Sequence, residues 1–322
     1  MRRLPIIWWG VWPDLKPGGP AVTPQPILAL LGPTGSAKSD VALRVAEELG
    51  ATILSVDSMQ VYRGMDIGTA KPTVAERRRV PHVMIDLVDP EENYTVAEFR
   101  RAAHHHLEQL GNTPVMVVGG SGLHFRAVVD PMSFPPHDDT LRKRLEETPP
   151  AELAAELLLA DPEAGERLDF RNSRRLIRAV EILRLTGATP SARATGQEAA
   201  ALREYRAERP LVAVGIDPGP DLPARLGTRL EGMLEAGLLR EVTELAPRLG
   251  RNAQAAVGYR QLLAVVRGEL AYKLGVEAVR KATLSLARRQ RTFFRRDPRI
   301  RWVPWSASVA DLGRVVREAL LS

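Results

Sequence analysis

The chain has 322 residues, 44% of them hydrophobic, which is enough for one substantial core and a second, smaller one. Because it contains no cysteine, we exclude disulfides, a thiolate nucleophile and a zinc site with cysteine ligands. A formal net charge of +6 favours an acidic partner such as a nucleic acid.

Residues 1–25 are predicted to be a flexible N-terminal extension. Two arginines and the short apolar run Ile6-Ile7-Trp8-Trp9 precede several prolines and glycines. This start resembles a signal peptide, but the apolar run is interrupted and no small-residue cleavage site follows it. No segment is long and apolar enough to span a membrane. We therefore expect a cytoplasmic protein.

A phosphate-binding loop is predicted directly after the first strand. The apolar run Ile27–Leu31 precedes the sequence GPTGSAKS, and apolar residues then recur at helical spacing. A strand, a glycine-rich loop and an amphipathic helix in this order are typical of a P-loop for a di- or triphosphate. The predicted phosphate-binding residues are Gly32, Pro33, Thr34, Gly35, Ser36, Ala37, Lys38 and Ser39, and the Ser39 hydroxyl is the predicted ligand of Mg²⁺.

Ala37 occupies the position before the lysine, where such loops usually have glycine. If residue 37 adopts a positive φ, alanine costs about 1 kcal/mol there. The alternative interpretation is an ordinary strand-to-helix turn of small residues, with Lys38 in solvent.

A second strand is predicted at Ala51–Val56, so Asp57 falls at its carboxyl end. In a parallel sheet, ligands bind at this edge, and Asp57 would face the phosphate loop. Its position alone leaves three roles open: a general base, an indirect partner of Mg²⁺, or a cap of the turn.

Strand-like runs at Val115–Val118 and Leu211–Ile216 continue the alternation of strands and helices, which predicts a parallel sheet covered on both faces. Strand signals vanish between Pro131 and about Pro210. The predicted fold is therefore α/β, with a P-loop NTPase-like parallel sheet core at 26–134 and 206–322. An all-helical domain is inserted at 135–205.

Arginines concentrate in two segments. Residues 288–301 contain seven arginines and one acidic residue, Asp297, and five further arginines lie at 167–178. Such clusters suit a nucleic-acid backbone, although a charge run is more often a solvated face.

The most specific pattern is SVDSMQVYRGMDIGTAKP at residues 55–72. Further segments at 80–90, 94–97, 117–123, 174–179, 256–259 and 288–295 follow in a fixed order. Together with the phosphate loop, they resemble the tRNA dimethylallyltransferases, also called tRNA isopentenyltransferases or IPP transferases. In that family the loop resembles GPTASGKT, so alanine and glycine are exchanged here. Ser121 stands where threonine is typical, and His124 where tyrosine is typical.

The resemblance implies transfer of a dimethylallyl group from dimethylallyl diphosphate to N6 of the adenine 3′ of a tRNA anticodon. It implies a monomeric enzyme that uses Mg²⁺. Asp57 would be the general base, Ser121 a polar contact near the reacting centre, and Arg229 the arginine that assists the diphosphate. Arg225, one helical turn earlier, is the competing choice for Arg229.

The resemblance also implies a path for the tRNA anticodon stem-loop. The implied contacts are Asp57, Ser58, Met59, Gln60, Ser121, Arg142, Arg174, Arg175, Leu176, Ile177, Arg178, Ala255, Ala256, Val257, Gly258, Tyr259, Arg260, Arg288, Arg289, Gln290, Arg291, Thr292, Phe293, Phe294 and Arg295.

Two other classes stay open. A small-molecule or nucleotide kinase would use the same loop for ATP, with a carboxylate after the second strand. A remodelling ATPase would need an apolar strand that ends in aspartate, whereas Val115–Val118 is followed by two glycines.

Overall fold

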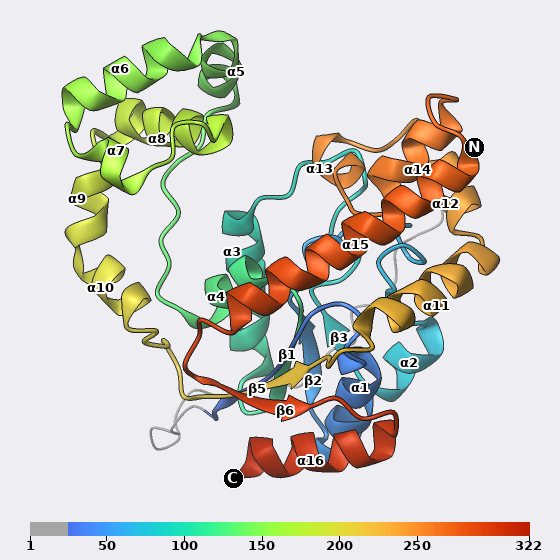
Figure 1. Ribbon diagram of the computed structural model, residues 1–322. Coiled ribbons are helices and arrows are strands. Elements are labelled where there is room, and N and C mark those ends of the chain that lie inside the picture. The colour runs from blue at the N-terminus through green and yellow to red at the C-terminus, as the bar shows by residue number, and fades with distance from the viewer. Residues whose placement is uncertain (1–24) are drawn as a thin grey trace, which may run out of the picture.

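The computed structural model describes residues 25–322, so the predicted extension at 1–25 lies outside the described residues, apart from Gln25. A six-stranded parallel sheet, in the order β3-β2-β4-β1-β5-β6, forms the centre of the molecule (Figure 1). Because β1 lies between β4 and β5, the loop that follows it sits in the middle of the carboxyl edge. The strands are β1 (Ile27–Leu31), β2 (Thr52–Ser55), β3 (His82–Val83), β4 (Val115–Gly119), β5 (Leu211–Asp217) and β6 (Ile300–Pro304).

Helices cover the sheet and form the rest of the described chain. They are α1 (Lys38–Leu49), α2 (Val74–Arg79), α3 (Val96–Leu110), α4 (Gly122–Val129), α5 (Asp139–Glu147), α6 (Pro150–Ala160), α7 (Ala164–Arg167), α8 (Ser173–Thr186), α9 (Pro190–Thr195), α10 (Gln197–Arg203), α11 (Leu222–Glu235), α12 (Leu238–Leu245), α13 (Arg251–Gln254), α14 (Tyr259–Val266), α15 (Tyr272–Phe294) and α16 (Val309–Leu321).

Both faces of the sheet are buried, as parallel sheets require. Side chains alternate along a strand, so Leu28 and Leu30 of β1 point to one face and pack with α1 and α16. The neighbouring residues Ala29 and Leu31 point to the other face and pack in the cluster that includes α3, α4, α12 and α14. The all-parallel α/β architecture confirms the predicted fold class.

Between α4 and β5 the described chain forms six helices, α5–α10, and no strand. Their buried side chains, such as Leu145, Leu157 and Val180, make an apolar cluster of their own. Figure 1 shows α5–α8 standing apart from the sheet, with α9 and α10 leading back to it. This helical segment overlaps the range 135–205, whose status as an inserted domain stays a prediction.

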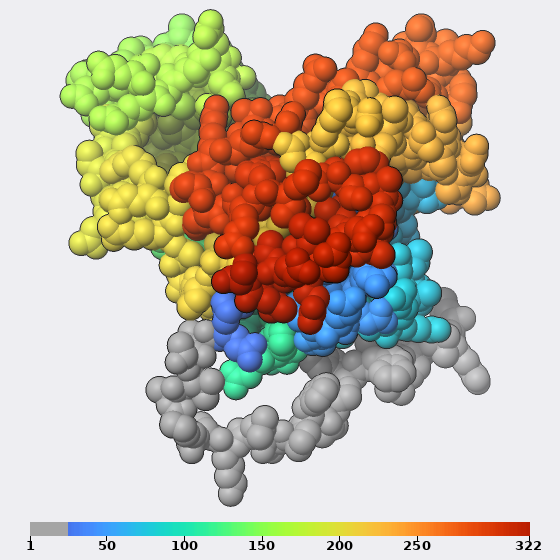
Figure 2. Space-filling model, turned by 60° about the horizontal axis from the view of Figure 1, so that its bottom comes forward, coloured from blue at the N-terminus to red at the C-terminus, as the bar shows by residue number. Residues whose placement is uncertain are grey.

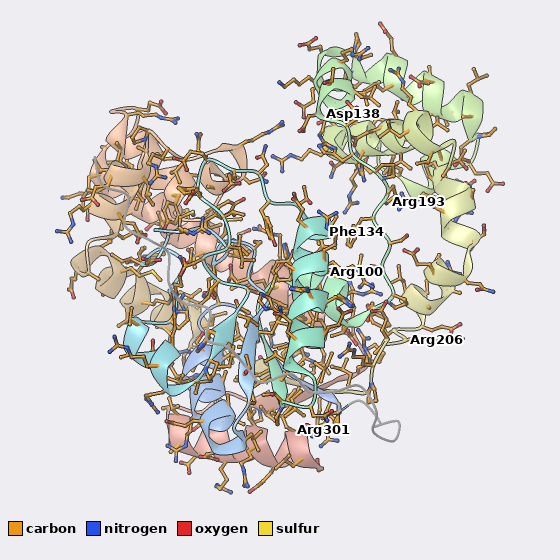
Figure 3. All side chains as sticks on the ribbon, turned by 180° about the vertical axis from the view of Figure 1, so that it is seen from behind. Arg100, Phe134, Asp138, Arg193, Arg206 and Arg301 are labelled. Atoms are coloured by element: carbon orange, nitrogen blue, oxygen red, sulfur yellow. The ribbon has the colours of Figure 1, made fainter. Side chains whose placement is uncertain are left out.

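Two connections link the helical segment to the sheet. Phe134 and Asp138 mark the outgoing one, and Arg206 marks the return (Figure 3). The guanidinium of Arg178 in α8 donates to the carbonyl oxygens of Pro135 and Pro136, at 2.7 and 2.9 Å. This fastens the outgoing connection to the helical segment.

The surface has two projections, formed by the helical segment and by the helices from α11 to α15, with a hollow between them (Figure 2). Two strands extend the predicted sheet: β3, of two residues, and β6, which begins at Ile300. Among residues 25–322, no helix has both the length and the apolar character needed to cross a membrane.

Candidate active site

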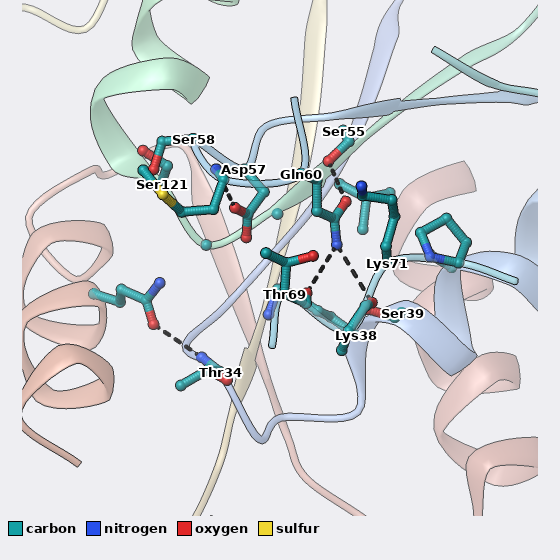
Figure 4. Close-up of a pocket in the computed structure, with 18 of the residues that line it drawn as sticks. Thr34, Lys38, Ser39, Ser55, Asp57, Ser58, Gln60, Thr69, Lys71 and Ser121 are labelled. Atoms are coloured by element: carbon teal, nitrogen blue, oxygen red, sulfur yellow. Dashed lines mark hydrogen bonds between the residues drawn. The ribbon is translucent and has the colours of Figure 1, made fainter. Parts of the chain in front are cut away.

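A cavity of about 580 Å³ lies at the carboxyl edge of the sheet. The phosphate loop, the segment after β2 and the turn after β4 line it, together with side chains of α11 and α15 (Figure 4). The predicted site residues that line this cavity are Thr34, Gly35, Ala37, Lys38, Ser39, Asp57, Ser58, Met59, Gln60, Ser121, Arg229, Ala256, Val257, Arg289, Gln290 and Phe293.

The phosphate loop presents free hydrogen-bond donors. Within the described chain, the backbone N–H groups of Gly35, Ser36 and Ala37 donate to no protein acceptor. They lie at the N-terminus of α1, where the helix dipole is positive. Free N–H groups on consecutive residues at a helix N-terminus are a suitable site for a phosphate anion.

Lys38 adds an ionisable group to the loop. Its Nζ atom donates to the carbonyl oxygen of Pro33 at 3.2 Å. Desolvation and, to a smaller extent, the nearby positive charge of Arg229 lower the pKa of Lys38 to about 8, whereas Asp57 opposes the shift. An anion bound between the two cations would relieve their repulsion.

Arg229 and Arg225 have different surroundings. Arg229 is exposed to solvent and lines the cavity, where desolvation lowers its pKa and the charge of Asp57 opposes the shift. The guanidinium of Arg225 lies on the ring of Trp305, 3.7 Å from the centroid, and its Nε donates to the carbonyl oxygen of Gly35 at 3.3 Å. Arg229 is therefore placed to contact a ligand, whereas Arg225 supports the loop from outside the cavity.

Asp57 is half-buried opposite the phosphate loop. Its Oδ1 accepts a hydrogen bond from the backbone N–H of Met59 at 2.8 Å, which fixes the turn after β2. Desolvation lowers the pKa values of Lys38, Arg229 and His124, and the negative charge of Asp57 opposes the shift in each case. The carboxylate therefore lies within electrostatic reach of all three groups. Capping the turn occupies only one of its lone pairs and leaves the carboxylate able to accept a proton.

Ser121 forms a pair with His124 in the first turn of α4. The Ser121 Oγ and His124 Nδ1 atoms are 2.8 Å apart. The imidazole meets the ring of Phe99 edge-on, with 4.6 Å between centroids. Burial lowers the pKa of His124 to about 4, so the imidazole is neutral at pH 7. The Nδ1 atom of a neutral ring can accept a hydrogen bond from the Ser121 hydroxyl and leave the Oγ lone pairs free for a ligand.

Most of the implied RNA contacts outside the cavity fall into three kinds of surroundings. Arg174, Arg175, Arg260, Arg288 and Thr292 are exposed, with no ion pair among the described residues. Four other arginines are held by carboxylates: Arg142 and Arg178 by Glu181, and Arg291 and Arg295 by Asp217.

The third group is buried. Leu176, Tyr259 and Phe294 are each no more than 1% exposed, so their side chains pack inside the protein and are closed to a partner in this structure. We assign these three side chains to the core rather than to a binding surface.

Some cavity residues were not among the predicted site residues. They include the segment Gly68–Pro72, together with Glu76 and His82. The similarity at 55–72 covers the whole of that segment, but its place over the cavity depends on a contact that forms only in the folded chain. The Gln60 Nε2 donates to the carbonyl oxygen of Thr69 at 3.2 Å, which closes the segment over the cavity.

Comparison with known proteins identifies the family. A family model described as IPP transferase matches residues 60–297, and one described as isopentenyl transferase matches residues 25–92. The tRNA dimethylallyltransferase of Parafrankia sp. (strain EAN1pec) is 42% identical over 305 residues, which cover 90% of this chain and 92% of the relative. That of Streptomyces coelicolor is 40% identical and covers 91% and 94%.

Solved structures agree with the sequence relatives. The full-length tRNA isopentenylpyrophosphate transferase of Bacillus halodurans superimposes with a TM-score of 0.65 at 29% identity, covering 92% of this chain and 97% of that one. The corresponding transferase of Staphylococcus epidermidis gives a TM-score of 0.66 at 27% identity, covering 92% and 99%. These neighbours support the predicted P-loop NTPase-like fold, and the chain belongs to the tRNA dimethylallyltransferase (IPP transferase) family.

Proposed function

We propose that this protein transfers a dimethylallyl group from dimethylallyl diphosphate to N6 of the adenine 3′-adjacent to the anticodon in tRNA. Pyrophosphate is released. The observation that carries the proposal is a single cavity in which the phosphate loop, Asp57 and Arg229 meet, in a chain of this family. The relatives are named tRNA dimethylallyltransferases, and the similarity covers nearly their whole length. The kinase alternative is therefore not favoured.

Asp57 acts as the general base. The N6 amine of adenine is a weak nucleophile, because its lone pair is delocalised into the ring. As nitrogen attacks C1 of the dimethylallyl group, the C–O bond to the diphosphate breaks and the N–H proton passes to the Asp57 carboxylate. Ser121 Oγ lies in the same cavity as a polar contact for the amine or the reacting carbon.

The phosphate loop stabilises the leaving group. Negative charge accumulates on the diphosphate as its bond to carbon breaks. Gly35, Ala37, Lys38 and Arg229 already line this cavity, so their donors need little reorganisation to meet the diphosphate. They therefore lower the energy of the transition state more than that of the bound substrate.

Mg²⁺ fits the donor set at the end of the loop. Ser39 lines the cavity in the first turn of α1 and supplies a hard oxygen ligand. Mg²⁺ commonly binds through one or two protein ligands together with substrate phosphates and water. When bound, it would neutralise part of the charge on the diphosphate.

The RNA substrate would lie across the hollow between the helical segment and α15. Exposed arginines face solvent on both sides: Arg174 and Arg175 on α8, and Arg288 on α15. We propose that residues 135–205 form an inserted RNA-binding domain. The adenine would leave its stack to bring N6 to Asp57. One copy of the chain supplies every residue of this proposed site.

The experiment is transfer of labelled dimethylallyl from its diphosphate to an unmodified anticodon stem-loop, with Mg²⁺ and without ATP. Wild type is compared with Asp57→Ala and with Asp57→Asn, which keeps the size of the side chain and its bond to Met59. We expect both variants to lower kcat by about 10²- to 10⁴-fold, the usual contribution of a general base.

Asp311→Asn is the matched control, because this exposed aspartate lies in α16, away from the cavity. It should transfer the label as wild type does. Wild type that fails to label the RNA, but turns over ATP on a small acceptor, would reject the proposal in favour of a kinase.

A further inference from the structure

The side chain of Gln290 reaches the phosphate loop from α15. Its Oε1 accepts a hydrogen bond from the backbone N–H of Thr34 at 2.9 Å, as the dashed line at Thr34 in Figure 4 shows. Gln290 also lines the cavity. An uncharged acceptor from a distant helix thus occupies the N–H group of Thr34, which directly precedes Gly35 in the loop.

The N–H groups of the loop are therefore not equivalent. Those of Gly35, Ser36 and Ala37 donate to no acceptor within the described chain, whereas that of Thr34 is engaged. A diphosphate next to Lys38 would use the free groups of Gly35 and Ala37, which line the cavity, and the N-terminus of α1. A longer polyphosphate would extend to the next donor along the loop, which is Thr34.

The carboxamide packs closely in this place. A Cβ atom on Gly120 would lie 2.6 Å from Gln290 Nε2, so glycine at this position leaves room for the amide where it lies. Ala287 and Phe294, one helical turn to either side of Gln290, are fully buried and anchor α15. Moving Oε1 away from Thr34 would require a shift of the helix or loss of the hydrogen bond.

We propose that Gln290 is a specificity-determining residue that restricts the phosphate loop to a diphosphate. A third phosphate group would bring anionic oxygen against the Gln290 carbonyl oxygen, and two acceptors repel each other. The N–H of Thr34 can donate to the Gln290 carbonyl oxygen or to the phosphate oxygen, but not to both. This inference rests on the proposed function, and it explains how a loop of the ATP-binding type selects a prenyl diphosphate.

The test compares binding of inorganic pyrophosphate and inorganic triphosphate by calorimetry in the presence of Mg²⁺. In wild type we expect pyrophosphate to bind more tightly. Gln290→Ala frees the N–H of Thr34, so the affinity for triphosphate relative to pyrophosphate should rise about tenfold, the effect of one hydrogen bond to a charged group. Gln290→Glu keeps the acceptor and adds negative charge, so the same ratio should fall.

Lys281→Ala is the control, because Lys281 is an exposed residue of α15 outside the cavity. Its ratio should equal that of wild type, and thermal unfolding would establish that each variant is folded. If Gln290→Ala does not fold, the inference is decided by whether Gln290→Glu lowers the affinity for triphosphate relative to pyrophosphate.

An unchanged ratio in the Gln290 variants, or an equal loss of both ligands, would overturn the inference and reduce Gln290 to a support of the loop. If the Gln290 variants give either of these results while wild type transfers dimethylallyl, the inference fails and the proposed function stands. Wild type that binds neither anion and transfers no label would instead reject the proposed function.

Discussion

Ala37 shows how a single residue of the phosphate loop strains the backbone. Its φ is 60° and its ψ is 16°, the left-handed conformation that alanine adopts at a cost. The positive φ on which the predicted cost depends is therefore present. Gly35, two residues earlier, also has a positive φ, of 80°. Relative to the family pattern, this chain has glycine where alanine is typical and alanine where glycine is typical.

We expect Ala37→Gly to raise the free energy of unfolding by about 1 kcal/mol, because glycine adopts this conformation without the clash of a Cβ atom. Urea denaturation of the unliganded protein measures the change. Gly35→Ala is the matched comparison, since its Cβ would lie 2.8 Å from Leu226 Cδ2 and 2.9 Å from Leu222 Cδ1. It should destabilise the protein by about 1–3 kcal/mol. If Ala37→Gly unfolds at a lower urea concentration than wild type, Ala37 does not strain the backbone.

The titration of Lys38 predicts a pH dependence of catalysis. Lys38 has a pKa of about 8 because of desolvation and the charge of Arg229. Below this pH the amine is charged and attracts the diphosphate; above it the charge is lost. We therefore expect kcat/KM for the prenyl donor, which reports groups of the free enzyme, to fall as pH rises through about 8.

Arg229→Gln removes a positive neighbour and so raises the pKa of Lys38. The fall in kcat/KM should then occur at higher pH, on top of a uniform loss of affinity. In Lys38→Ala the inflection should disappear. A profile in which Arg229→Gln moves the inflection to lower pH would show that the electrostatic coupling has been misassigned.

At the scale of elements, helix α12 shapes the segment that closes the cavity. The Glu241 carboxylate accepts from the backbone N–H groups of Asp66, Ile67 and Gly68 at 2.9, 2.7 and 3.0 Å. It also accepts from the Tyr259 hydroxyl at 2.5 Å, and burial raises the pKa of that hydroxyl above its usual range. One carboxylate thus ties three elements together.

Glu241→Ala should lower the free energy of unfolding by about 2–4 kcal/mol, because it leaves several donors without an acceptor. Tyr259→Phe removes only the hydroxyl and should cost about 1 kcal/mol. Chemical denaturation measures both. Glu244→Ala, an exposed change on the same helix, should stay within about 0.5 kcal/mol of wild type. Equal effects of Glu241→Ala and Glu244→Ala would show that the carboxylate has no such role.

Local patterns in the sequence predict some elements and miss others. The apolar runs of β1, β2, β4 and β5 are long enough to identify as buried strands, and the phosphate loop and Asp57 follow from them. β3 has only two residues, His82 and Val83, which is too short for a local pattern to identify as a strand. The three N–H groups that converge on Glu241, and the bond from Thr34 to Gln290, join residues far apart in the chain and exist only in the folded protein.

At the scale of the whole molecule, the arginines that give the chain its positive charge divide into two functional groups. Arg178 supports the fold, because it pairs with the fully buried Glu181 and holds the connection at Pro135 and Pro136. Arg174 and Arg175, one turn earlier on the same helix, are exposed and pair with no carboxylate among the described residues. Sequence alone treats all three as equal members of one basic cluster.

The double variant Arg174→Ala/Arg175→Ala should weaken binding of the anticodon stem-loop without lowering the melting temperature. A protein that neutralises fewer phosphates releases fewer counterions on binding, so the slope of log affinity against log salt should become shallower by about 1–2. Arg178→Ala should instead lower stability by about 2 kcal/mol, because it leaves the buried Glu181 with fewer partners. Filter binding across a salt series and thermal denaturation separate the two effects. A double variant that loses stability but keeps its salt slope would place Arg174 and Arg175 with the structural arginines and move the RNA path away from α8.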